Sequence, residues 1–194
     1  QLFFMYATML IAVPTGVKVF NWTATMWRGS MTFEVPMLFS IGFIFLFVIG
    51  GFSGVVCAIV PIDIQVQDTY YVIAHFHYVL VSGALFALFA GAYYWLPKWT
   101  GHMYDEALGK WHFWLSMIFF NVAFFVQHFL GLAGMPRRIP DYALQFADFN
   151  MISSVGAFGF GLTQLLFVYI VIKCVRGGEK AADKTWEGAT TLEW

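Results

Sequence analysis

Long apolar runs, separated by short polar breaks, make up most of the sequence. Five of these runs are close to or above the roughly 20 residues that an α-helix needs to cross the hydrocarbon core of a bilayer. They cover residues 2–20, 36–60, 70–96, 112–132 and 151–175. The pattern therefore predicts an all-α fold, a multi-span transmembrane helical bundle that forms one membrane domain over residues 1–194, with a short tail from about residue 176.

Composition agrees with a lipid environment. Hydrophobic residues make up 60% of the chain and charged residues 11%, whereas soluble domains contain roughly 45–50% and about 25% of these classes. The net charge of −1 and the lack of a basic block argue against a nucleic-acid partner. An apolar run follows Gln1 directly and the sequence stops at Trp194, so we expect a fragment of a longer protein.

Lysine and arginine are distributed unevenly between the polar breaks. The breaks at residues 21–35 and 97–111, together with the C-terminal region, contain Arg28, Lys98, Lys110, Lys173, Arg176, Lys180 and Lys184. The breaks at residues 61–69 and 133–150 contain only Arg137 and Arg138. Because cytoplasmic loops are enriched in these residues, we expect the breaks at residues 21–35 and 97–111 and the tail to lie on the first, cytoplasmic side of the membrane. The other two breaks then lie on the second side. The membrane is expected to be the cell (inner) membrane. Cys57 and Cys174 then lie near opposite faces, too far apart for a disulfide.

Two histidines lie deep in the third apolar run. Histidine inside a membrane is costly and indicates function. His75 and His77 are two residues apart, which separates them by roughly 200° around one helix. They therefore point to opposite sides and cannot bind one ion from that helix, although each can bind a separate metal. The alternative is that both form hydrogen bonds to neighbouring helices.

The sequence around these histidines resembles a known family. The run DTYYVIAHFHYVL at residues 68–80 is similar to the tenth transmembrane helix of subunit I of the heme–copper oxidases. This resemblance implies that His75 binds the iron of the high-spin heme, where O₂ is reduced, and that His77 is an axial ligand of the low-spin heme. Further similarity at residues 14–20, 127–131, 134–138 and 191–194 extends over the chain and implies helices eight to twelve of a twelve-span subunit.

Charged residues on the second side have a structural and a functional interpretation. Arg137 and Arg138 can be solvated loop charges, and Asp63 can cap a turn. The resemblance instead implies that the two arginines hold heme propionates, for which guanidinium groups are suited, and that Asp63 joins the polar network near the high-spin heme. It also implies a Mg²⁺ or Mn²⁺ site at Asp68 and at Gln67, where the family usually has histidine. An amide oxygen can also ligate Mg²⁺.

Lys18 lies near one end of the first apolar run. A lysine there can extend its ammonium group to the membrane surface. The resemblance implies instead that Lys18 and Thr15, which share a helix face, carry protons from the cytoplasm to the O₂ site, and Pro14 is expected to kink the helix nearby. Of the other histidines, we expect His102 and His112 to be solvated or interfacial and His128 to serve in packing or hydrogen bonding.

The resemblance also implies an activity. It indicates the catalytic subunit of a proton-pumping terminal oxidase of the cytochrome c oxidase branch, with two hemes, of which heme A is expected, and a copper ion whose ligands lie outside this fragment. The expected partners are subunits II and III, cytochrome c as electron donor through subunit II, O₂ and the lipid membrane. The fragment alone is not expected to be active. A quinol oxidase of the same family is an alternative, and a membrane transporter or a non-catalytic scaffold is another.

Overall fold

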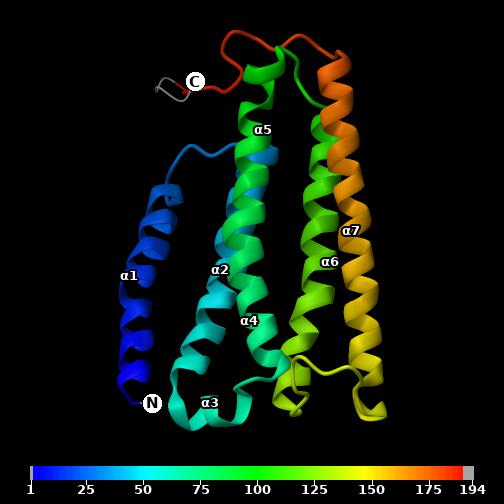
Figure 1. Ribbon diagram of the computed structural model, residues 1–194. Coiled ribbons are helices and arrows are strands. Elements are labelled where there is room, and N and C mark those ends of the chain that lie inside the picture. The colour runs from blue at the N-terminus through cyan, green and yellow to red at the C-terminus, as the bar shows by residue number, and fades with distance from the viewer. Residues whose placement is uncertain (1, 190–194) are drawn as a thin grey trace.

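The computed structural model describes residues 2–189, and in this range the chain is mainly helical (Figure 1). Its five spans are, in chain order, α1, α2, a composite helix, α6, and a 3₁₀ turn together with α7. They are Leu2–Met26, Val35–Ala58, Tyr70–Thr100, Glu106–Leu132 and Leu144–Arg176. Each is long and apolar enough to cross a membrane. The predicted all-α bundle of five spans is therefore confirmed.

The third span changes its winding partway along. It consists of α4 at Tyr70–Leu80, a π-helical turn η1 at Val81–Phe86, and α5 at Ala87–Thr100. Ser82 lies in this turn, and its hydroxyl donates to the carbonyl of Tyr78 in α4. A π-helical turn is rare and often lies near a functional site, and this one begins four residues after His77.

Three polar breaks are shorter than the hydropathy pattern predicts, and the observed connections are residues 27–34, 101–105 and 133–143. Helix α1 continues to Met26, and the hydroxyls of Thr23 and Thr25 donate to Val19 O and Asn21 O within the same helix, at 2.9 and 2.8 Å. Helix α6 (Glu106–Leu132) begins six residues earlier than expected, because the Asp105 carboxylate accepts from Leu108 N and caps its first turn. The predicted limits at residues 20, 96, 112 and 151 are therefore wrong, because the helices continue through polar residues.

The connections lie at two opposite ends of the bundle (Figure 1). One end contains the connections at residues 27–34 and 101–105 and the segment after Arg176. The other end contains the short helix α3 (Val60–Val66) and the connection that leads through the 3₁₀ turn η2 (Leu144–Phe146) into α7 (Ala147–Arg176). This alternation agrees with the predicted two-sided arrangement, and which end is cytoplasmic stays a prediction.

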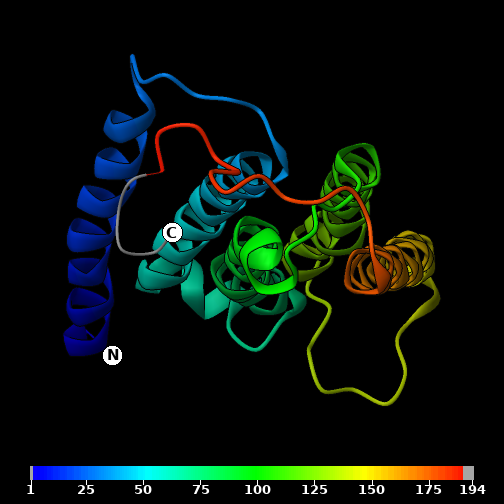
Figure 2. The ribbon, with the colours of Figure 1, turned by 90° about the horizontal axis from the view of Figure 1, so that it is seen from above.

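Helices α2, α4, α5, α6 and α7 form the packed bundle, while α1 lies at its edge (Figure 2). Helix α1 packs on α2, where Trp22 meets Phe43 with ring centroids 5.0 Å apart, and none of its residues is buried within residues 2–189. Helices α6 and α7 pack closely because Gly156 lies directly against the backbone of Ala123. Helix α1 is therefore less enclosed than the other spans.

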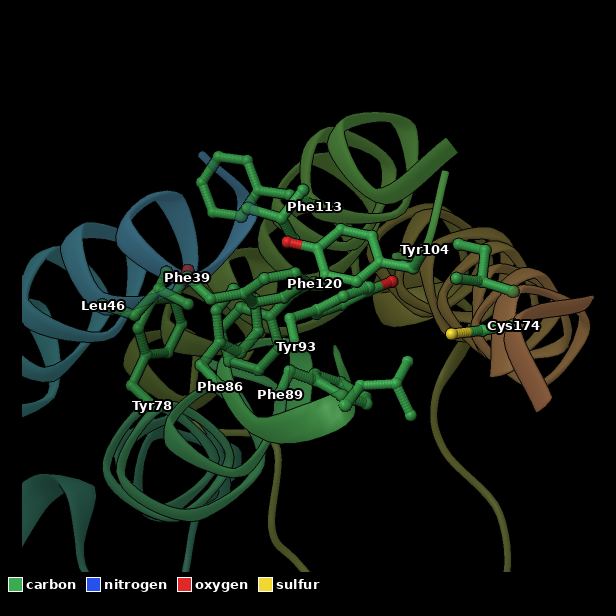
Figure 3. Close-up of a cluster of buried hydrophobic side chains, with 13 residues drawn as sticks. Phe39, Leu46, Tyr78, Phe86, Phe89, Tyr93, Tyr104, Phe113, Phe120 and Cys174 are labelled. Atoms are coloured by element: carbon green, nitrogen blue, oxygen red, sulfur yellow. The ribbon is translucent and has the colours of Figure 1, made fainter. Parts of the chain in front are cut away.

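Aromatic side chains form the core of the bundle (Figure 3). Phe39 lies at its centre, with its ring 5.7 Å from Tyr93 and 5.2 Å from Phe113. His112 is fully buried here, with Nδ1 3.0 Å from the Tyr93 hydroxyl and Nε2 3.4 Å from Gln164 Oε1. The expectation that His112 is solvated or interfacial is therefore wrong, because the extended α6 places it inside the bundle.

The C-terminal segment folds back over the end of the bundle. Ala181 N donates to Gly101 O at 2.9 Å, and the Trp186 ring stacks on Tyr94 with centroids 5.7 Å apart. Residues 191–194, which carry one part of the resemblance, lie outside the described residues. Cys57 and Cys174 are both free thiols, as predicted.

Candidate functional site

His75 and His77 lie on opposite sides of α4. The imidazole of His75 contacts α2, where Nδ1 is 3.0 Å from Gly50 O and 3.1 Å from Ser53 Oγ. The imidazole of His77 contacts α6 and stacks on Phe124 with centroids 4.1 Å apart and planes inclined by 16°. The opposite directions predicted from their spacing are therefore confirmed.

A short segment of α2 shapes the surroundings of His75. In the run GGFSG, Gly50 supplies a carbonyl, Ser53 supplies a hydroxyl, and Gly54 leaves room for the ring. A Cβ atom at Gly54 would lie 2.9 Å from His75 Cε1, too close for an ordinary contact. Sequence reasoning missed this segment, although two glycines and a serine at this spacing in an apolar helix were a visible signal.

The hydrogen bonds of both histidines fix the same tautomer. A carbonyl oxygen only accepts, so the Nδ1 atom beside it must carry the proton. His75 Nδ1 faces Gly50 O, and His77 Nδ1 lies 2.7 Å from Ile73 O. Within residues 2–189, neither Nε2 atom has a hydrogen-bond partner. Each Nε2 therefore has a free lone pair, the form that binds a metal, with its orientation held by a backbone carbonyl.

A hollow of about 280 Å³ begins at His75 and extends between α1 and α2. Most of its wall is apolar, and Thr15 of α1 is one of the few polar residues that line it. The Thr15 hydroxyl donates to Ile11 O at 2.9 Å. Lys18 does not line the hollow and is exposed on α1. The fold thus brings Thr15 but not Lys18 to the hollow that His75 lines, and the roles of both in proton transfer stay predictions.

Arg137 and Asp68, predicted for two different sites, form one ion pair. Arg137 Nε and Nη2 both lie 2.6 Å from Asp68 Oδ1. The two backbones are also joined, because Arg137 N donates to Asp68 O at 2.9 Å. Asp68 thereby orients Arg137 just before the first turn of α4, while the Asp68 side chain remains 62% exposed. Arg138 is exposed beside this pair, with φ at 60°, an unfavourable backbone conformation for a long side chain.

Asp63 lies on α3, and Gln67 follows α3 and directly precedes Asp68 of this ion pair. Both line a separate hollow of about 510 Å³ with Cys57, and partial burial raises the pKa of the Asp63 carboxyl. Among residues 2–189, no three His, Cys, Asp or Glu side chains gather closely enough to hold a metal ion. A Mg²⁺ or Mn²⁺ site at Asp68 and Gln67 therefore needs ligands from elsewhere, and it stays a prediction.

His128 is buried near the start of α4. Its Nδ1 atom lies 3.2 Å from Phe125 O, and its ring packs against Tyr71 and Tyr78. These contacts agree with the predicted packing and hydrogen-bonding role. His102 is half-buried in the connection at residues 101–105, near the bundle surface.

Comparison with known proteins agrees with this geometry. The family model described as cytochrome C and quinol oxidase polypeptide I matches residues 1–159. A probable cytochrome c oxidase subunit 1-beta of Nocardia farcinica is 51% identical over 195 residues, covering 99% of this chain and 33% of that protein. Cytochrome c oxidase subunit 1 of Cereibacter sphaeroides is 50% identical over 196 residues, covering 100% of this chain and 35% of that protein.

The fold is also similar to a solved structure. A chain of a heme-copper terminal oxidase dimer, determined by cryo-EM, superposes with a TM-score of 0.78 over 95% of this chain and 38% of that chain. Its sequence is 18% identical, so this likeness concerns the fold alone. The chain spans about a third of the length of the curated relatives it matches.

Proposed function

The chain belongs to the cytochrome c and quinol oxidase polypeptide I family, and from this premise we propose that it is part of the catalytic subunit of a terminal oxidase. That oxidase reduces O₂ to water with electrons from cytochrome c and pumps protons across the membrane. The observation that carries the proposal is the pair of histidines on opposite sides of α4, each with Nδ1 on a carbonyl and Nε2 free.

The residues present fit two hemes. Imidazole is a usual axial ligand of heme iron, and His75 and His77 have the tautomer and the separate directions that two irons require. Phe76 and Phe124 stack on the His77 ring, at 4.6 and 4.1 Å, and limit its rotation. When bound, the hemes and the copper supply the redox chemistry. The chain supplies ligand atoms, their orientation and an apolar surrounding.

Charged residues near the N-terminal end of α4 support the same proposal. Arg137 and Arg138 neutralise heme propionates, and Asp68 keeps the Arg137 guanidinium in one orientation. Asp63 joins this polar region. Asp68 and Gln67, with ligands from subunit II, hold Mg²⁺ or Mn²⁺. These roles follow from the family, while the ion pair and the positions of the side chains support them.

Lys18 and Thr15 form part of a path for protons that enter from the cytoplasm. The position of Thr15 on the hollow beside His75 supports its share of this role. The path runs through the cell membrane, with the C-terminal tail on the cytoplasmic side. Subunits II and III complete the oxidase, the hemes are of type A, and the copper ligands lie on helices that precede this part of the sequence.

Cytochrome c rather than quinol is the proposed donor because relatives about 50% identical over the whole chain are named cytochrome c oxidase subunits. The family description covers both donors. Oxidation of reduced cytochrome c by the purified full-length complex, compared with oxidation of a quinol, decides between them.

Histidine variants of the full-length protein test the proposed function. We expect His77→Ala to lose the low-spin heme signal first and His75→Ala to abolish CO binding. His102→Ala is the control, because His102 lies in a surface connection, and it should keep both signals. Retention of both hemes in both variants would show that the assignment is wrong. A full-length protein without any heme spectrum would favour a transporter or scaffold.

A further inference from the structure

Three polar atoms form a closed triangle between α2 and α4. Ser53 Oγ lies 2.9 Å from Gly50 O and 3.1 Å from His75 Nδ1, and His75 Nδ1 lies 3.0 Å from Gly50 O. Ser53 is only 6% exposed, and the surrounding helix is apolar. The residues Gly50 and Ser53 are buried, and His75 is half-buried beside the hollow.

The direction of each hydrogen bond follows from the carbonyl. Gly50 O can only accept, so it receives both the Nδ1–H of His75 and the hydroxyl hydrogen of Ser53. The Ser53 oxygen, having donated its own hydrogen, is left to accept a share of the Nδ1–H. As a carbonyl inside α2, Gly50 O is also expected to accept from the backbone four residues later. Three donors thus compete for an oxygen with two lone pairs.

We propose that Ser53 is a positioning residue that weakens the hydrogen bond between His75 and Gly50 and so limits the electron donation of His75 to the iron it binds. This inference rests on the proposed function, in which His75 Nε2 is a heme ligand. A strong Nδ1–H···O=C bond raises the basicity of an imidazole ligand. By occupying Gly50 O and sharing the Nδ1–H, the Ser53 hydroxyl limits this increase in the basicity of His75. The ferrous form of the heme iron is then stabilised relative to the ferric form.

A purely local role for the hydroxyl is the competing explanation. Serine in an apolar helix commonly donates back to a carbonyl of the preceding turn. Ser40, on the same helix, does this by donating to Pro36 O at 2.8 Å, and within residues 2–189 no hydrogen bond joins it to a histidine. Ser40→Ala is therefore a matched control, because it removes the same kind of bond from α2 without changing the surroundings of His75.

The experiment uses four variants of the full-length oxidase: Ser53→Ala, Ser53→Thr, Ser53→Val and Ser40→Ala. Thr and Val have nearly the same shape and differ in the hydroxyl, so this pair decides the question even if Ser53→Ala fails to assemble. The measurements are the midpoint potential of the high-spin heme and its iron–histidine stretching frequency by resonance Raman spectroscopy. Both measurements depend on the basicity of the histidine ligand. A loss of packing alone has no reason to shift the potential and the stretching frequency in the directions expected for a change in basicity.

We expect Ser53→Ala and Ser53→Val to lower the potential and raise the stretching frequency. The expected change is roughly threefold in the ratio of oxidised to reduced heme at a fixed potential, or about 30 mV for a one-electron couple. Ser53→Thr and Ser40→Ala should remain at the wild-type values. Wild-type values in Ser53→Val, a shift to higher potential, or equal shifts in Ser53→Thr and Ser53→Val would each overturn the inference.

Failure of the proposed function gives a different result. In that case the wild-type protein lacks a high-spin heme, or His75→Ala retains one. If the wild-type heme is present and depends on His75 but the Ser53 variants leave both measurements unchanged, the inference about Ser53 alone is wrong.

Discussion

Substitution of Gly131 by alanine should strongly destabilise the contact between α6 and α4. Gly131 lies in the last turn of α6, against the first turn of α4. A Cβ atom there would lie 2.0 Å from Tyr71 N and 2.5 Å from Tyr71 Cα, whereas ordinary contact begins at 3.4 Å. The obstructing atoms are backbone and cannot rotate away, so α4 and α6 must separate by more than 1 Å.

Two opposing contributions decide whether Gly131→Ala stabilises or destabilises the protein. Alanine gains up to about 1 kcal/mol over glycine inside a helix, whereas overpacking of a close contact costs typically about 1–3 kcal/mol. Because backbone atoms obstruct Gly131→Ala, we expect the upper part of that range and a net loss of stability. Separation of the two helices also moves His77 away from Phe124, so the low-spin heme should be bound less well.

Thermal loss of the heme absorbance in the purified full-length complex measures the effect. Gly161→Ala on α7 is the matched control, because a Cβ atom there meets nothing within 4 Å. We expect Gly161→Ala to leave the midpoint temperature unchanged or slightly raised, and Gly131→Ala to lower it by at least a few degrees. Equal midpoints for the two variants would refute the argument from helix contact.

Two further substitutions test the charged candidates. Lys18→Met keeps the apolar stem of the side chain but cannot carry a proton, so O₂ consumption should fall severely while heme content stays constant. Near-normal turnover, beside Lys18→Arg as a comparison, would leave Lys18 as a lysine that only reaches the membrane surface. Asp68→Asn removes the charge that orients Arg137 at 2.6 Å, so Mg²⁺ or Mn²⁺ measured in the purified complex should decrease. Unchanged metal content in this variant would show that Asp68 serves the ion pair alone, and absence of both metals from the wild type would show that no site exists.

The five spans were predictable from the sequence, but several of their limits were not. Hydropathy identifies apolar runs, and it ended the first span at residue 20 and began the fourth at residue 112. Thr23 and Thr25 form hydrogen bonds within α1, and Asp105 caps the first turn of α6. Polar side chains can therefore belong to a helix, and average polarity then places the end of the helix too early.

The candidate site was predictable in part. The spacing of His75 and His77 was sufficient to predict their opposite directions. The pairing of Asp68 with Arg137, which are 69 residues apart, was not, and these residues had been predicted for separate sites. The burial of His112 depends on Tyr93 and Gln164, which lie on other helices.

The sequence by itself determined the features that depend on a single helix: the number of spans, their alternation across the membrane, and the sides to which His75 and His77 point. These follow from the length of each apolar run and the fixed period of the α-helix. Only the tertiary structure decided what each imidazole meets. Gly50 and Ser53 contact His75, and Phe124 contacts His77, because close packing of α2, α4 and α6 brings together residues that are distant in the chain. Such contacts depend on the shapes of both helix surfaces at once, and no local pattern of residues contains that information.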